Sequence, residues 1–337
     1  MAIYPLQKMN QKRVLSTVLA LICLYCQHAY SQGFSAVVAF GDSLSDLGNT
    51  TATLSNTFTG YNSYYYDQGR WSNGPVWVEN LVGQLGLTGF QRNDGTNLYG
   101  IDFAWGGSTS GTGYTYVYLA NLREQVRLYI ALRKTKYAQM PDIGTTLFTI
   151  WSGGNDVIYY VEDGTAVTAQ QISDNIAAAI TALYNAGGRF FVVPNLPPLG
   201  YKPNYRNTKY QDKANDFVVA YNPVLQNRLM QLRQQLAGIT IIPFDAYKVF
   251  LAVLMNPSQY GLKNVTDSAF TPNYNPTENY GSVVANPDQY LFWDETHPTR
   301  AGHKIIARSL VNAVTTTFGV PLGDARSSAT LLAGSGW

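Results

Sequence analysis

The sequence predicts an α/β fold, in which helices cover both faces of a mostly parallel β-sheet to give a three-layer α/β/α sandwich. Two observations predict it. Short apolar runs typical of buried strands alternate along the chain with longer segments whose apolar residues recur at helical spacing. No linker, repeat or low-complexity segment divides residues 32–337, so we expect them to form a single domain.

Apolar runs predict strands over residues 35–40, 145–151, 189–194 and 239–243. Longer periodic segments predict helices over residues 74–85, 119–136, 169–186, 212–236, 246–255 and 298–318. Gly187 and Gly188 mark the end of the third helix. Pro223 must start, kink or break the fourth, because proline lacks the backbone donor of a helix interior. Pro298 is expected in the first turn of the last helix.

The first 31 residues are typical of a secretory signal peptide. Lys8, Lys12 and Arg13 form a positive segment, residues 14–26 form an apolar one, and residues 29–31 have the small-x-small pattern of a cleavage site. The apolar segment is shorter than the roughly 20 residues that a membrane-spanning helix needs, which disfavours an anchor. We therefore expect a secreted, extracellular protein without a transmembrane segment.

Removal of the signal peptide changes the composition in two ways. Both cysteines, Cys23 and Cys26, are lost, and a chain of this size can bury a core without disulfides. Three positive charges and no negative ones also leave, so the net charge goes from +2 to −1. With only 13% charged residues, the chain lacks the basic surface that nucleic acids or anionic membranes attract.

Two N-glycosylation sequons occur, at Asn49 and at Asn264. Asn264 lies in a polar stretch that indicates a loop, so we expect this sequon to be the occupied one. Asn49 lies six residues after Ser43, and we expect it to be too buried for modification.

Two distant segments supply a nucleophile and a base. The first apolar run breaks at Ser43, and His297 is one of only two histidines in residues 32–337. A serine becomes a nucleophile when a base removes its proton, and the base is usually a histidine that a carboxylate orients. Asp294 lies three residues before His297, so both can converge in one turn. Ser43 and Asn155 each follow an expected strand, which places them at the carboxyl edge where α/β sheets bind ligands.

Four blocks of the sequence, in order, resemble the GDSL family of esterases and lipases, also called SGNH hydrolases. These blocks are residues 40–46 (FGDSLSD), 101–109 (IDFAWGGST), 151–156 (WSGGND) and 294–297 (DETH). The resemblance implies that residues 32–337 form a single SGNH hydrolase domain around a five-stranded, flavodoxin-like sheet. It also implies that Ser43, Asp294 and His297 are catalytic and that no cofactor or metal is needed.

The resemblance further implies three donors for the oxyanion of an acyl-transfer intermediate. They are the backbone N–H of Ser43, the N–H of Gly107 and the side-chain amide of Asn155, with Gly106 in place of Gly107 if the alignment slips by one residue. One departure is visible, because Asp102 stands where the second block usually opens with asparagine. An ionised Asp102 cannot donate a hydrogen bond, so an asparagine-type bond there is lost or reversed.

Other polar residues near these blocks fit structural roles. We expect His303 to lie on the surface or behind the catalytic groups, and Asp46 and Asp156 to hold loops near the strand ends. Two neighbouring histidines without a thiol or a carboxylate cluster do not make a metal site.

Two other enzyme classes are excluded because their sequence motifs are incomplete or absent. Residues 41–46 also resemble the metal-binding segment of haloacid-dehalogenase-like phosphatases, but these need an Asp-x-Asp motif that the chain lacks. The Gly-x-Ser-x-Gly elbow of α/β-hydrolases is absent as well. The alternative from another class is an inactive, secreted carbohydrate-binding protein, which the complete set of Ser43, Asp294 and His297 disfavours.

Less specific features of the sequence indicate the substrate. Residues 69–77 and 195–200 resemble a secreted fungal subgroup that includes acetylesterases acting on sugars and shades into lipase- and phospholipase-like members. Tyrosine clusters at residues 64–66 and 114–118, among 25 tyrosines, offer rings that can stack on sugars or wall an acyl chain. We expect a monomeric acetylesterase acting on a small-molecule or oligosaccharide ester, with a lipase- or phospholipase-type acylhydrolase as the alternative.

Overall fold

A computed structural model of the protein describes residues 33–54, 65–93, 100–115, 119–136, 139–272 and 281–318. The expected signal peptide lies outside the described residues. Within them, parallel strands form a central six-stranded sheet in the order β2-β3-β1-β6-β7-β8. These strands are β1 (Ala36–Gly41), β2 (Phe90–Arg92), β3 (Gly100–Asp102), β6 (Thr146–Trp151), β7 (Phe190–Pro194) and β8 (Thr240–Phe244).

The expected architecture is confirmed, but the sheet has six strands instead of five. Without β2, the strands follow the flavodoxin-like order 2-1-3-4-5, in which the order reverses beside β1. The sixth strand, β2, pairs in parallel with β3 at the edge. Both β2 and β3 are three residues long, too short to show a periodic apolar pattern.

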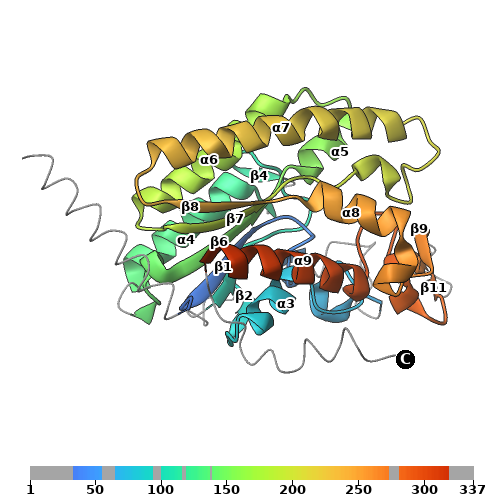
Figure 1. Cartoon of the computed structure of the whole chain (residues 1–337), viewed down its shortest axis with the longest axis horizontal. Helices are drawn as coiled ribbons and strands as arrows, with labels where there is room; N and C mark the ends of the chain where they lie inside the picture. The colour runs from blue at the N-terminus through green and yellow to red at the C-terminus, as the bar shows by residue number, and fades with distance from the viewer. Residues whose placement is uncertain are drawn as a thin grey trace, which may run out of the picture.

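Helices pack on both faces of this sheet. Figure 1 shows α4, α6 and α7 on one side and α3 and α9 on the other, and two separate buried clusters fill the spaces between. The helices are α2 (Asn49–Leu54), α3 (Trp77–Gln84), α4 (Leu122–Lys136), α5 (Gly154–Glu162), α6 (Ala169–Asn185), α7 (Gln211–Gln235), α8 (Ala246–Met255) and α9 (Arg300–Phe318). None of the helices within the described residues has the length and apolar character to cross a membrane.

Strand β1 shows why both faces of the sheet need cover. Val37 and Ala39 face one buried cluster, while Val38 and Phe40 face the other. Side chains alternate between the faces of a strand, so a strand that is apolar at every position must be buried on both sides. This is the pattern from which the parallel sheet was expected, and it places β1 in the middle of the molecule.

Pro223 neither starts nor breaks its helix, and Pro298 lies outside the helix that it was expected to open. Helix α7 continues through Pro223 as one element from Gln211 to Gln235. Pro298 does not open the last helix, which begins at Arg300. Pro298 instead forms an isolated bridge with Phe292, and the hydroxyl of Thr299 accepts a hydrogen bond from the N–H of Gly302. Thr299 therefore caps α9, as a hydroxyl side chain commonly does.

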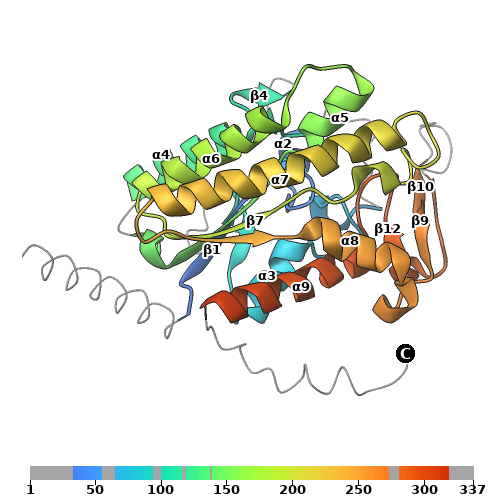
Figure 2. The same ribbon diagram turned by 45° about the horizontal axis from the view of Figure 1, so that its top comes forward.

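Short strands lie beyond the end of the central sheet, beside α8 (Figure 2). Strand β9 (Asn264–Ser268) pairs in parallel with β12 (Tyr290–Phe292), and β10 (Phe270–Pro272) pairs antiparallel with β11 (Gly281–Val283). A further short pair joins β4 (Tyr114–Thr115) to β5 (Leu119–Ala120). The loop expected around Asn264 is therefore wrong, because the sequon opens strand β9.

Gly41 ends β1 where two strands approach closely. Its φ angle is +151°, and a β-carbon there would lie 2.1 Å from the carbonyl oxygen of Trp151 on β6. A side chain at this position must therefore strain the backbone and separate the two strands. Glycine is the residue that fits without either change.

We predict that Gly41→Ala lowers the free energy of unfolding by at least about 2 kcal/mol, since backbone strain and overpacking each cost roughly 1–3 kcal/mol. Urea unfolding followed by circular dichroism measures it. Gly83→Ala is the control, because an added β-carbon in that exposed turn of α3 meets no atom within 4 Å. This control should stabilise the helix by about 1 kcal/mol. Equal effects of the two substitutions would contradict the packing argument.

Candidate active site

Ser43 lies in a tight turn directly after β1, at the mouth of a cavity of 320 Å³. The N–H groups of Ser45 and Asp46 both donate to the carbonyl of Asp42, and the N–H of Leu44 donates to its carboxylate. These bonds close the turn around Ser43. The side chain of Ser43 is thereby directed from the carboxyl edge of the sheet into the cavity that it lines.

A buried glutamine on α4 fixes the end of β1 from the other side. The side-chain oxygen of Gln125 accepts the N–H of Gly41 at 2.9 Å, and its amide nitrogen donates to the carbonyl of Gly41 at 2.8 Å. The hydroxyl of Ser108 donates to the same carbonyl. Residue 41 therefore keeps both of its backbone groups paired beyond the last rung of the sheet. No local pattern in the sequence marks Gln125 for this role.

Asp294 and His297 share one turn, as their spacing predicts. The carboxylate of Asp294 accepts the N–H groups of Thr296 and His297 at 2.8 and 2.7 Å. The same carboxylate contacts Nδ1 of His297 at 2.8 Å. The other ring nitrogen of His297, Nε2, lies 2.9 Å from the Oγ of Ser43. The structure thus brings Ser43, His297 and Asp294 into one continuous chain of contacts.

Electrostatics keep Asp294 ionised despite its burial. Burial alone would raise the pKa of Asp294, but the charge of His297 and the hydrogen bonds from His297 and Thr296 outweigh it and hold the pKa below its usual value. A carboxylate that stays charged can hold the imidazole with its Nδ1 proton facing Asp294. Nε2 is then left as the acceptor for the proton of Ser43.

Two aromatic residues complete the surroundings of this chain. The hydroxyl of Tyr66 donates to Asp294 at 2.9 Å, and Tyr66 is only 6% exposed. The ring of Trp71 lies 5.4 Å from that of His297, tilted by 31°. Tyr65 stacks on Phe270 instead of lining the cavity. Neither Tyr65 nor Tyr66 lines this cavity, so the suggested contact of these two rings with a sugar or an acyl chain stays a prediction.

The remaining tyrosines of the two expected clusters give no test of that role. Tyr64, Tyr116 and Tyr118 lie outside the described residues, as does the side chain of Tyr114. Of the tyrosines that the structure describes in these clusters, Tyr66 donates a hydrogen bond to the carboxylate of Asp294. Periodicity could not reveal this contact, which joins residues 228 positions apart.

The structure distinguishes the two glycines of the second block. The N–H of Gly106 donates to the carboxylate of Asp46 at 3.0 Å and to the hydroxyl of Thr50 at 2.7 Å, so it serves the loop itself. Gly107 lines the cavity with Ser43, and no residue described by the structure accepts its N–H. Gly107 is therefore the glycine of the pair that has a donor to offer.

Asn155 lies at the start of α5 and also lines the cavity. Its side-chain nitrogen donates to the carbonyl of Ser108 at 2.9 Å. One amide hydrogen is used in this bond, which fixes the side chain, and the second hydrogen remains to be offered. Ser43, Gly107 and Asn155 thus present the three expected donors to one cavity.

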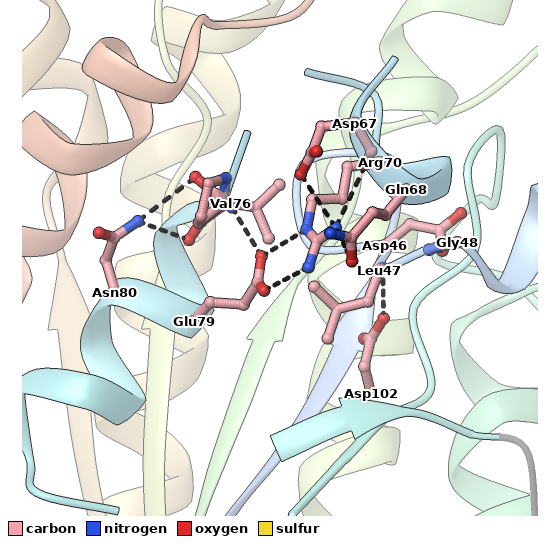
Figure 3. Close-up of polar contacts among 11 residues, drawn as sticks. Asp46, Leu47, Gly48, Asp67, Gln68, Arg70, Val76, Glu79, Asn80 and Asp102 are labelled. Atoms are coloured by element: carbon pink, nitrogen blue, oxygen red, sulfur yellow. Dashed lines mark hydrogen bonds and ion pairs between the residues drawn. The ribbon is translucent and has the colours of Figure 1, made fainter. Parts of the chain in front are cut away.

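Asp102 shows how the departure in the second block is accommodated. Its carboxylate accepts the N–H of Leu47 at 2.8 Å, the N–H of Ala104 at 2.9 Å and the side-chain amide of Asn49 at 3.2 Å (Figure 3 shows the Leu47 contact). Every partner is a donor, so the direction of hydrogen bonding is reversed relative to an asparagine that donates. Burial, together with the charge of Asp46, raises the pKa of Asp102 well above its usual value.

The side chain of Asn49 is buried within this network. Its side-chain nitrogen donates to the carbonyls of Asp102 and Ala104, and the residue is 3% exposed. Asn264 is only partly buried, and its side-chain nitrogen donates to Asp267 at 2.7 Å. Burial of Asn49 therefore agrees with the expectation that this sequon is not modified in the folded protein.

Arg70 holds the segment that carries Trp71. Its guanidinium makes two parallel bonds to Glu79 on α3, at 2.8 and 2.7 Å, and a third to Asp67 at 3.2 Å (Figure 3). Glu79 also accepts the N–H of Val76. Paired bonds of this kind fix both distance and direction, so residues 67–76 are tied to α3 while Trp71 reaches over His297.

The other polar residues behave as structural elements. His303 is fully buried, and its Nδ1 accepts the N–H of Trp77 at 3.2 Å, which excludes the surface position and leaves the other expected one, behind the catalytic groups. Burial and the neighbouring His297 lower the pKa of His303 to about 3, which leaves its ring neutral. Asp46 bridges the Ser43 turn to Gly106, and Asp156 accepts two bonds from Ser110. Both aspartates thus hold loops, as expected.

The cavity has apolar and polar walls. The apolar lining is provided by Leu44, Trp71, Ile158, Pro197, Pro198, Leu199, Phe250, Phe292 and Pro298. The polar lining, besides Ser43 and His297, is provided by Asp42, Asn155, Glu162, Lys202, Asn204 and Thr296. The described residues hold no cluster of three or more histidine, cysteine or acidic side chains arranged to bind a metal ion.

A serine, a histidine and an aspartate in hydrogen-bond contact at the carboxyl edge of a parallel sheet have the geometry of a serine hydrolase site. Comparison with known proteins defines the family. The profile described as GDSL-like Lipase/Acylhydrolase matches residues 37–310, and the chain belongs to this family. The protein is therefore a carboxylic ester hydrolase of the GDSL esterase/lipase type.

Among known proteins, the chain is 28% identical to a thermolabile hemolysin of Vibrio parahaemolyticus, over 82% of this chain but only 63% of that protein. It is 27% identical to a phosphatidylcholine-sterol acyltransferase of Aeromonas hydrophila, over 88% of this chain and 95% of the other. It is 26% identical to a GDSL esterase/lipase of Arabidopsis thaliana, over 90% and 98%.

Solved structures similar to this chain include a catalytic mutant of an acetylxylan esterase from Geobacillus stearothermophilus. That structure is 16% identical, with a TM-score of 0.46, and the match covers 84% of this chain and 94% of the other. A member of the lipolytic G-D-S-L family from Veillonella parvula matches at 14% identity and a TM-score of 0.41, over 83% and 98%.

We predict that Tyr66→Phe lowers kcat/KM for a simple ester about 10-fold, because a hydrogen bond to a charged group contributes roughly 1.5–3 kcal/mol. Steady-state hydrolysis of p-nitrophenyl acetate measures the loss. Tyr65→Phe is the matched control, since the hydroxyl of Tyr65 donates to the carbonyl of Gly281 and not to the triad. If both variants lost activity equally, the contact of Tyr66 with Asp294 would not be the cause.

Proposed function

We propose that the protein hydrolyses carboxylic esters by acyl transfer through Ser43. The observation that carries this proposal is the 2.9 Å contact between Ser43 Oγ and His297 Nε2, with Asp294 on the opposite ring nitrogen. His297 removes the proton of Ser43 as its oxygen attacks the ester carbonyl. His297 then protonates the departing alcohol, and an acyl-enzyme is left on Ser43.

The second half of the reaction repeats the first with water as the nucleophile. His297 deprotonates the water, which attacks the acyl-enzyme, and the acid leaves as Ser43 regains its proton. In each half, the negative charge on the former carbonyl oxygen is stabilised by the N–H groups of Ser43 and Gly107 and by the amide of Asn155. Removal of one such donor typically costs about 2.7–4 kcal/mol of barrier stabilisation.

For the substrate, we propose an acetyl ester of a sugar or oligosaccharide. The cavity of 320 Å³ is at the small end of the range of about 300–1,000 Å³ for ligand pockets, which suits a short acyl group. Its polar residues Glu162, Lys202 and Asn204 offer hydrogen bonds to hydroxyl groups. The apolar lining near Ile158 and Phe250 is then left for the acetyl methyl group and the flat faces of sugar rings.

A lipid or phospholipid ester is the second candidate. The continuous apolar lining from Pro197 to Leu199, with Phe250 and Phe292, provides a surface on which an acyl chain can lie. The relatives named as a thermolabile hemolysin and a phosphatidylcholine-sterol acyltransferase favour this alternative by sequence. Acyl-chain preference separates the two candidates directly.

We also propose that residues 1–31 are a signal peptide, that residues 32–337 form the mature domain, and that it is secreted as a monomer. Expression with the native N-terminus should release protein into the medium that begins at Gln32, as N-terminal sequencing would show. Size-exclusion chromatography with light scattering should give the mass of one chain. Protein retained in cells with residues 1–31 attached would contradict secretion.

We predict that kcat/KM is highest for p-nitrophenyl acetate and falls along the series to the octanoate, because the small cavity accommodates a short acyl group better. Ser43→Ala should remove the activity almost completely, by about 10⁶-fold if the triad acts as a unit. Ser309→Ala, a helical serine that does not line the cavity, is the control.

Each outcome of this series has a distinct meaning. Rates that rise with chain length would replace the acetyl-sugar proposal with the lipid candidate. Hydrolysis that persists in Ser43→Ala, or that is absent from the unmodified protein for every ester, would contradict the proposed mechanism.

A further inference from the structure

The cavity contains a second group of polar side chains that the acyl-transfer mechanism does not use. Lys202 lies directly after the short 3₁₀ turn Leu199–Tyr201, Asn204 lies two residues further on, and Glu162 is the last residue of α5. All three line the same cavity as Ser43. They come from two elements that are far apart in sequence, so the fold has assembled them at this place.

Lys202 is buried in an unusual way. The residue is only 3% exposed, and its ammonium group makes no ion pair or hydrogen bond with the residues that the structure describes. Its one close partner is the ring of Tyr205, whose centroid lies 3.6 Å from Nζ. Burial lowers the pKa of Lys202 to about 8, and the charges of Glu162, Asp294 and Glu295 counteract part of that effect. At neutral pH the group is thus a charged donor that lacks an acceptor.

Tyr205 links this donor to an acceptor. Its hydroxyl donates to one carboxylate oxygen of Glu162 at 2.7 Å, while its ring lies under the ammonium of Lys202. Tyr205 itself is fully buried, so it holds both groups in place. Glu162 is exposed and lines the same cavity, and none of the described residues donates to its other carboxylate oxygen. Lys202 and Glu162 therefore contribute a donor and an acceptor to the lining of one cavity.

The group is also tied to the catalytic turn. The N–H of Asn204 donates to the carbonyl of Glu295, which lies between Asp294 and His297 in the chain. Residues 202–205 are further closed by two bonds, from the N–H groups of Tyr205 and Arg206 to the carbonyl of Lys202. The donor and acceptor consequently keep a constant position relative to the triad, as a binding subsite requires.

We propose that Lys202, Glu162 and Asn204 form a subsite that binds the hydroxyl groups of a polyhydroxylated alcohol, the part of the ester that leaves from Ser43. This inference rests on the proposed function. A hydroxyl group both donates and accepts a hydrogen bond, so neighbouring hydroxyls satisfy the ammonium and the other carboxylate oxygen of Glu162 together. Burial then becomes favourable in the complex, because a buried charge is stable when it is hydrogen-bonded.

Charge argues against an anionic ligand at this subsite. The ammonium of Lys202 is one positive group, whereas Glu162, Asp294 and Glu295 are the carboxylates that influence it. A phosphate placed on Lys202 would meet repulsion from these three groups. A neutral polyol meets none, which favours a sugar-like alcohol over the headgroup of a phospholipid.

The test compares two esters that share an acetyl group and differ in the alcohol. We expect Lys202→Met to lower the ratio of kcat/KM for acetylated xylobiose to kcat/KM for p-nitrophenyl acetate about 10- to 100-fold, the loss typical of a charged hydrogen bond. Glu162→Gln, which keeps an acceptor for Tyr205, should lower the same ratio less. Lys209→Met is the matched control, because Lys209 also lies over a tyrosine ring but does not line the cavity.

An unchanged ratio, or an equal loss on both esters, would overturn the subsite. A loss confined to dihexanoyl phosphatidylcholine would assign Lys202 to a phosphate headgroup and overturn the subsite as well.

A binding measurement separates this proposal from the proposed function. Calorimetry should show xylobiose binding to Ser43→Ala and weakening when Lys202→Met is added. That result, together with no Ser43-dependent hydrolysis of any ester, would support the subsite while the proposed reaction fails.

Discussion

Strand β1 is hydrogen-bonded to β6 along its whole length, from the pair Ala36–Thr146 to the pair Gly41–Trp151. Because both strands end at the same level, the segments that follow them leave the sheet side by side. One segment carries Ser43 and the other carries Asn155. Strand β3 pairs on the opposite side of β1 and leads to Gly107. The register of three short strands thus determines where the nucleophile and its donors meet.

The sequence predicted those parts of the fold and of the site that are encoded by neighbouring residues. Apolar runs predicted the long strands, and four short blocks located Ser43, Gly107, Asn155 and the turn of His297. Contacts between distant segments left no such signal. Tyr66 and Gln125 act through hydrogen bonds to residues 228 and 84 positions away, and nothing in their own neighbourhoods marks them. The edge strand β2 was missed because three residues are too few for a period to show.

The carboxyl groups of Asp42 and Asp294 are both buried near Ser43, but their pKa values shift in opposite directions because their neighbours differ. Asp42 is buried and receives few donors, and burial raises its pKa to about 7. Asp294 is also buried, yet the charge of His297 and the hydrogen bonds from His297 and Thr296 hold its pKa below the usual value. The acid that supports the imidazole is therefore selected by its donors. His303, neutral behind the site, adds no competing positive charge.

The buried amide of Asn49 has a consequence for how the protein must be made. A sequon is recognised on an extended chain, before the protein folds. In the folded protein, the side-chain nitrogen of Asn49 donates hydrogen bonds to Asp102 and Ala104 and so links the segment after Ser43 to the Asp102 loop. A sugar attached at that moment would remove a donor that the finished structure needs and would occupy space that it lacks. The folded structure therefore requires an Asn49 without an attached sugar.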